Sequence, residues 1–134
     1  MRQSLFAWFG LALLLVPTVF AAVFGLRAAL EQSTMPLFVV AGALGVLAGR
    51  VAAVELGSVS VSWRQLLGGS YLLVAFANAL SFAGMFSTAD STASLVAAGG
   101  AVVGSLCLAF MGIDIARDGR HFQVTGNVDR VLSL

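Results

Sequence analysis

The chain has 134 residues, of which 60% are hydrophobic and only 10% are charged. A soluble globular domain carries about 25% charged residues, so this chain lacks the polar side chains that would cover a compact body in water. Seven basic residues nearly cancel six acidic ones, which excludes the clustered positive charge needed to bind nucleic acid. The composition predicts an integral membrane protein whose surroundings are the lipid bilayer, with no nucleic-acid partner.

Four apolar stretches follow one another along the chain, each close to the roughly 20 residues that a helix needs to cross the hydrocarbon. They cover about residues 5–26, 36–56, 63–86 and 92–115. The links between them are short, which favours antiparallel neighbours. We predict an all-α membrane protein, with a four-transmembrane-helix up-down bundle over residues 1–116 and a short polar cytoplasmic tail over 117–134.

The first stretch has two interpretations. Arg2, a long apolar run and the small residue Ala21 are also typical of a signal peptide with its cleavage site. The run is longer than the roughly 7–15 residues of a signal peptide's apolar region, and it continues past Ala21. This favours a transmembrane helix, which Pro17 should kink, and leaves cleavage as the alternative.

Helix-capping residues mark the next boundaries. Ser33 or Thr34 can cap the second helix, with Pro36 in its first turn, and Gly57 is expected to end it. Residues 57–62 alternate small and apolar side chains, which predicts a short extended piece on the membrane surface. Ser62 followed by Gln65 is a capping box that should start the third helix.

The end of the fourth helix and the tail carry the single histidine. Asp90 or Ser91 can cap the start of this helix. Asp114, Asp118 and His121 would share one face of a continuous helix and could hold a metal ion. Gly119 predicts that the helix stops first, so we expect a solvated polar tail without a metal site or cofactor. Residues 124–128 could turn a small hairpin, which would be marginal in isolation.

Arginine placement predicts the orientation. An even number of crossings places both termini on one side of the membrane, and the opposite side then holds only Arg27. Positively charged loops concentrate in the cytoplasm, so we expect a multi-pass protein of the cell membrane with both termini cytoplasmic. The arginines on or near the terminal side are Arg2, Arg50, Arg64, Arg117, Arg120 and Arg130.

Small residues recur at every fourth position of the apolar stretches. Such stripes let helix backbones approach closely in lipid, where no hydrophobic force drives helices together. We therefore predict helix–helix contacts along these stripes, and keep the lining of a narrow pore as the alternative. The predicted packing residues are Ala41, Gly45, Gly49, Ala53, Gly100 and Gly104.

Among the polar residues of the predicted spans, Arg50, Glu55 and Asn78 form a possible intramembrane polar site. An ionisable residue within a membrane is a candidate functional site, because its burial in hydrocarbon is costly. Arg50 lies within reach of the headgroups and Glu55 almost at the interface, which favours anchoring or pairing between helices. Asn78 is deeper, and we expect it to bond Ser105 or a free carbonyl; a transport path is the alternative.

No enzyme motif is present. The single Cys107 lies in an apolar run, and no nucleophile has a neighbouring base in a recognisable pattern. We predict a non-enzymatic accessory or structural membrane module that associates with other membrane subunits or with itself. The alternative is a small oligomeric transporter or channel for a polar solute or ion.

Overall fold

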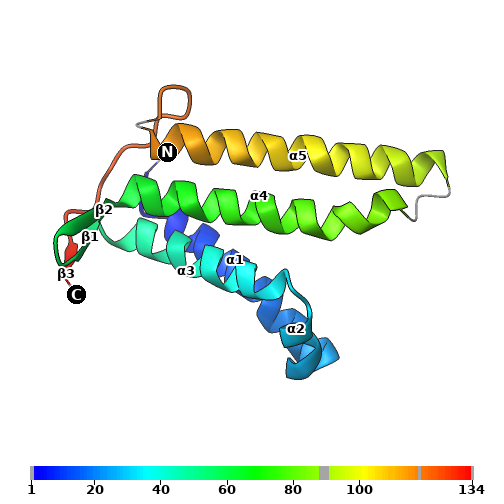
Figure 1. Ribbon diagram of the computed structural model, residues 1–134. Coiled ribbons are helices and arrows are strands. Elements are labelled where there is room, and N and C mark those ends of the chain that lie inside the picture. Colours follow the sequence, from blue (N-terminus) through cyan, green and yellow to red (C-terminus); the bar gives the residue numbers. More distant parts are fainter. Residues whose placement is uncertain (1, 88–90, 118, 134) are drawn as a thin grey trace.

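The computed structural model describes residues 2–87, 91–117 and 119–133, and within these residues it contains five helices and three short strands (Figure 1). Residues 2–4 and all three strands lie at one end of the molecule, which we call the base; the opposite end is the far end. The helices are α1 (Leu5–Phe24), α2 (Leu26–Glu31), α3 (Met35–Arg50), α4 (Trp63–Ser87) and α5 (Thr92–Ala116), and the strands are β1 (Ala53–Leu56), β2 (Val59–Ser62) and β3 (Val131–Ser133).

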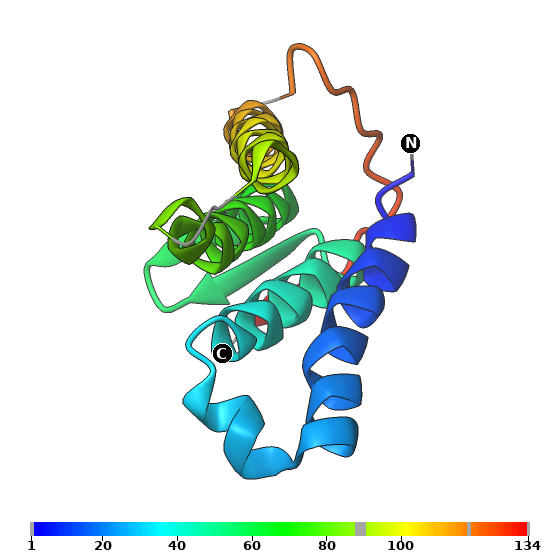
Figure 2. The same cartoon turned by 90° about the vertical axis from the view of Figure 1, so that its right-hand side faces the viewer.

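The long helices form an open row. α1 packs against α3, α3 against α4, and α4 against α5, whereas α1 and α5 are not among the closely packed pairs of the described residues. Figure 2 shows α5 and α1 at the two ends of this row. The helices run alternately away from the base and back to it, so the up-down order holds while the bundle stays unclosed on one side.

The first helix ends earlier than predicted. The expected span over 5–26 is interrupted at Gly25, and α2 continues the chain in a new direction. Gly25 has a φ of 91°, a left-handed conformation that glycine adopts without steric cost. Residues 26–31 therefore form a separate short helix at the far end.

The second predicted span over 36–56 is wrong at its C-terminal end. α3 stops at Arg50, and the residues expected on its last turn, Ala53 and Glu55, lie on β1 instead. The carbonyls of Ala48 and Val51 accept hydrogen bonds from another part of the chain, and Val51 has an extended backbone with φ −131° and ψ 148°. The chain then continues as a strand because two other strands pair with it.

A three-stranded sheet closes the base, in the order β2-β1-β3. β1 pairs with β2 in antiparallel register and with β3 in parallel register, Ala53 lying opposite Ser62 on one side and Val131 on the other. Gly57 was predicted to end a helix, but it lies in the β1–β2 turn, where its φ is 60°. The extended piece expected over 57–62 is thus confirmed in part, whereas 124–128 contains no hairpin.

The third and fourth helices agree with their predicted bounds of 63–86 and 92–115. The capping box before α4 is confirmed: the backbone N–H of Ser62 donates to Gln65 Oε1 at 2.9 Å, and the N–H of Gln65 donates to Ser62 Oγ at 3.4 Å. Ser91 caps α5 in a reciprocal pair with Ser94, and Asp90 lies outside the described residues. Thr34 precedes α3 without a side-chain cap.

Three of the described helices are long and apolar enough to cross a membrane, namely α1, residues Trp63–Ala83 of α4, and α5. α3 is apolar but has only 16 residues, a rise of about 24 Å against roughly 30 Å of hydrocarbon. The chain is a candidate multi-span helical protein, and the fourth crossing stays a prediction.

The packed core lies near the base. Beyond it, large apolar side chains on α1, α4 and α5 are exposed, as expected for helices whose solvent is lipid. Phe9 of α1 and Tyr71 of α4 stack with ring centroids 5.0 Å apart, which joins these two helices across the core. The buried members of the core cluster are Phe6, Ala48, Val51, Val54, Leu66, Leu67, Tyr71 and Ile115.

Candidate functional site

Gln3 is the most completely buried polar side chain at the base, with none of its surface exposed. Its amide nitrogen donates to the carbonyls of Ala48 at 2.9 Å and Val51 at 2.8 Å, and its Oε1 accepts from the N–H of Asn127 at 3.2 Å. The last carbonyls of a helix have no partner within the helix. Gln3 therefore supplies hydrogen-bond donors to the C-terminal end of α3 from a distant part of the chain.

The segment after α5 ties the N-terminus to the sheet. The N–H of Gln3 donates to the carbonyl of Thr125, and Asn127 exchanges two side-chain hydrogen bonds with Ser4. Further along, the carbonyl of Arg130 accepts from the N–H of Ala52 at 2.7 Å. Residues 125–133 of the predicted polar tail therefore form an ordered segment across the base, which we call the strap.

α1 and α3 approach each other through glycines. A Cβ atom added at Gly45 would lie 2.9 Å from the Cα of Gly10, and one added at Gly49 would collide with the backbone of Ala7. The predicted packing residue Ala41 is fully buried, and its carbonyl accepts from Ser70 Oγ of α4 at 2.7 Å. The structure therefore places Ala41, Gly45 and Gly49 at helix contacts.

The contact between α4 and α5 involves glycines that sequence reasoning missed. A Cβ atom at Gly112 would lie 2.8 Å from the carbonyl oxygen of Gly68 and 3.1 Å from side-chain atoms of Leu72 and Tyr71. Gly112 and Ala116 are four residues apart, which is the same small-residue spacing used elsewhere. This spacing near the end of the fourth apolar stretch could have predicted the contact from the sequence.

The remaining predicted packing residues do not lie at such contacts. Ala53 is on β1, and the structure places nothing within 4 Å of a Cβ atom added at Gly100 or Gly104. Both glycines are exposed on α5. With Ala93 and Ala97, also exposed, they fall within about 60° of one another around the helix. We call Ala93, Ala97, Gly100 and Gly104 the α5 seam.

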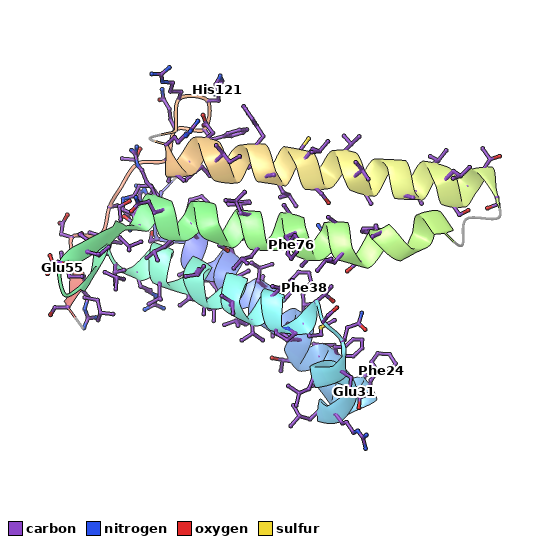
Figure 3. The ribbon with its side chains drawn as sticks, viewed as in Figure 1. Phe24, Glu31, Phe38, Glu55, Phe76 and His121 are labelled. Carbon is purple, nitrogen blue, oxygen red and sulfur yellow. The ribbon has the colours of Figure 1, made fainter. Side chains whose placement is uncertain are left out.

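The three predicted polar residues are not brought together. Arg50 is exposed at the last position of α3, and Glu55 is exposed on β1 at the base (Figure 3). Asn78 is half-buried on α4, and its side chain makes no hydrogen bond within the described part of the chain. Its expected partner, Ser105, donates instead to the carbonyl of Ala101 in its own helix at 2.9 Å. The expected Asn78–Ser105 bond is therefore absent.

Asp114 and His121 do meet, but through a turn and not along a helix. α5 ends at Ala116, and the N–H of Gly119 (φ 64°) returns to the carbonyl of Asp114 at 2.7 Å. The Asp114 carboxylate then accepts from the backbone N–H groups of His121 and Phe122 at 3.0 and 2.9 Å, and lies 2.9 Å from His121 Nδ1. Asp118 lies outside the described residues.

This turn adjoins two hollows on the same flank of α5. The first, about 450 Å³, is lined by Phe110, Ile113, Asp114, Arg117 and Arg120. The second, about 350 Å³, is apolar and is lined by Val103, Leu106, Cys107, Phe110, Met111 and Phe122. A third hollow, about 640 Å³, lies at the far end between α1, α2 and α3 and is almost wholly apolar.

Among the described residues, no group of three or more His, Cys, Asp or Glu side chains could hold a metal ion. Cys107 is exposed on α5, where it lines the apolar hollow. The arrangement defines a candidate multi-pass helical membrane protein.

Comparison with known proteins gives the family. Residues 1–128 match the profile of DUF7994, described as a family of unknown function, and the chain belongs to this family. No curated protein and no solved structure matches the chain.

Proposed function

We propose that the protein is a non-enzymatic structural module of the cell membrane that associates with a second copy of itself through α5. The observation that carries this proposal is the α5 seam. Its four small residues are exposed, and Gly100 and Gly104 have no atom within 4 Å of an added Cβ. At the helix crossings inside the molecule, a neighbouring helix occupies the space beside glycines of similar spacing.

A second copy fits this seam for a geometric reason. Gly100 and Gly104 form a GxxxG pattern, which allows two helix backbones to approach closely and gain dispersion contacts in lipid. Such a stripe is self-complementary, so a two-fold axis brings each glycine pair against its own counterpart. The open row of helices leaves α5 accessible for this contact. We take both termini to be cytoplasmic, as the arginine distribution predicts.

The test is cross-linking in native membranes. In a Cys107→Ser background, Ala97→Cys should form a disulfide-linked dimer, whereas Val102→Cys, exposed on another face of α5, should not. Gly100→Leu with Gly104→Leu should convert a detergent-solubilised dimer to monomer in sedimentation. Gly99→Leu, which also meets no atom within 4 Å, is the matched control.

Three results would overturn the proposal. A wild type that is monomeric in sedimentation and gives no Ala97→Cys dimer removes the second copy. An Ala97→Cys adduct with a different protein replaces the second copy with another subunit. If the wild type supports solute flux into liposomes and a correctly folded Asn78→Leu variant does not, the protein is a transporter. Against this alternative, Arg50 and Asn78 line none of the three hollows described above.

A further inference from the structure

We infer that the base end of α5 carries a binding site for one anionic phospholipid, with the headgroup phosphate between Arg117 and Arg120 and an acyl chain in the adjoining apolar hollow. The two hollows share Phe110, so a polar and an apolar compartment are continuous along one flank of the helix. This inference does not rest on the proposed self-association.

Two arginines give the headgroup compartment its positive charge. Arg117 and Arg120 are exposed, line the hollow of about 450 Å³, and form no ion pair with any residue in the described ranges. The guanidinium group offers a fork of donors that matches the oxygens of a phosphate. The two arginines can therefore hold a phosphate without first breaking an ion pair to any residue that the structure describes.

Asp114 also lines this hollow, but its carboxylate is already engaged. It accepts from two backbone N–H groups and lies 2.9 Å from His121 Nδ1, and its side chain is only 9% exposed. Its repulsion of an incoming phosphate is weakened by these donors. The same hydrogen bonds fold the chain back after Gly119 and so fix the positions of Arg120 and Phe122 beside α5.

The apolar compartment follows from this turn. Phe122 is brought against α5, where its ring lies 6.3 Å from that of Phe110, and the two rings border the base end of the hollow. From there the hollow runs along α5 past Leu106 to Val103. A helix of 25 residues rises about 38 Å, more than the roughly 30 Å of hydrocarbon. The arginines just past its end therefore lie at headgroup level while Val103 lies within the acyl region.

The occupant is a lipid because both compartments are present. A free phosphate or a soluble anion would use the arginines and leave the apolar hollow facing bulk lipid. A zwitterionic lipid would fill the apolar hollow but gain less from the arginines, since its headgroup carries its own cation. Basic residues next to a transmembrane helix are a common means of recognising anionic lipids.

Native mass spectrometry of the full-length protein in mild detergent tests the inference, with phosphatidylglycerol and phosphatidylcholine of identical chains supplied together. Wild type should retain phosphatidylglycerol preferentially. Arg117→Gln with Arg120→Gln should reduce that preference about thirty-fold, which corresponds to about 1 kcal/mol for each arginine near an anionic surface. Arg130→Gln, an exposed arginine at the base outside the hollow, should leave the preference unchanged.

A second variant probes the apolar half. Val103→Trp should fill the hollow and reduce retention of both lipids, while the ratio between them stays the same. Both sets of substitutions are at exposed positions, and the lipid-free melting temperature should stay at the wild-type value. The inference would be overturned if Arg130→Gln lost as much of the preference for phosphatidylglycerol as the double variant, or if the double variant lost none of it. Displacement of phosphatidylglycerol by an equal concentration of inorganic phosphate would also overturn it.

Discussion

At the residue scale, a single amide side chain binds the end of α3. Gln3 supplies both N–H groups of its amide to carbonyls at the end of that helix and receives a third bond from the strap. Its position near the N-terminus, 45 and 48 residues from the two acceptors, hides this role from any local sequence pattern. Because these groups are buried, removing the Gln3 amide should lower the free energy of unfolding, since an unpaired buried carbonyl costs about 1–3 kcal/mol.

We predict that Gln3→Leu lowers the free energy of unfolding by about 2–4 kcal/mol, because it leaves buried hydrogen-bonding groups of α3 and the strap without a partner. The measurement is a thermal melt in detergent followed by helical circular dichroism. Gln32→Leu is the matched control, because Gln32 is exposed at the far end. Equal melts for Gln3→Leu and wild type would show that water or another group replaces the amide.

At the element scale, contacts between helices are decided by which small residues face a neighbour. Gly45 and Gly49 of α3 meet α1, and Gly68 of α4 meets Gly112 of α5, whereas Gly100 and Gly104 meet nothing within 4 Å. The spacing of four is the same in filled and unfilled stripes. Sequence reasoning could therefore find the stripes but could not say which of them an internal helix covers.

The α1–α3 crossing gives a prediction at this scale. Gly49→Leu should destabilise the protein by about 2–4 kcal/mol, because any Cβ at this position collides with the backbone of Ala7 and must push the two helices apart. A melt in detergent measures the effect. Gly99→Leu places the same side chain at a helical glycine with open space around it. If both variants melt alike, the crossing does not contribute to stability.

At the scale of the whole molecule, the strap and the sheet bring both termini to the base. β3 pairs with β1, and residues 2–4 bond residues 125–127, so the two ends of the chain lie on one side of the helical row. Glu31 and Phe24 mark the opposite end in Figure 3. This arrangement agrees with an even number of crossings, while the side of the membrane rests on the arginine distribution.

We predict that the base faces the cytoplasm. In a Cys107→Ser background, Ser133→Cys should react with an impermeant maleimide only after cells are permeabilised. Gln32→Cys, exposed beside α2 at the far end, should react in intact cells. The reverse labelling pattern would show that the protein is inserted the other way round, and labelling of both sites in intact cells would contradict the even number of crossings.

The sequence by itself predicted a membrane protein and most of the limits of its helices. Composition indicates lipid around the helices. The bounds of α4 and α5, with the caps at Ser62 and Ser91, follow from local rules, because capping groups bond within three residues of each other. The tertiary structure alone decided that α3 stops at Arg50 and that Glu55 lies on a strand. Those outcomes depend on Gln3, β2 and β3, because a backbone buried within the protein needs a partner for each hydrogen-bonding group, however distant in sequence that partner lies.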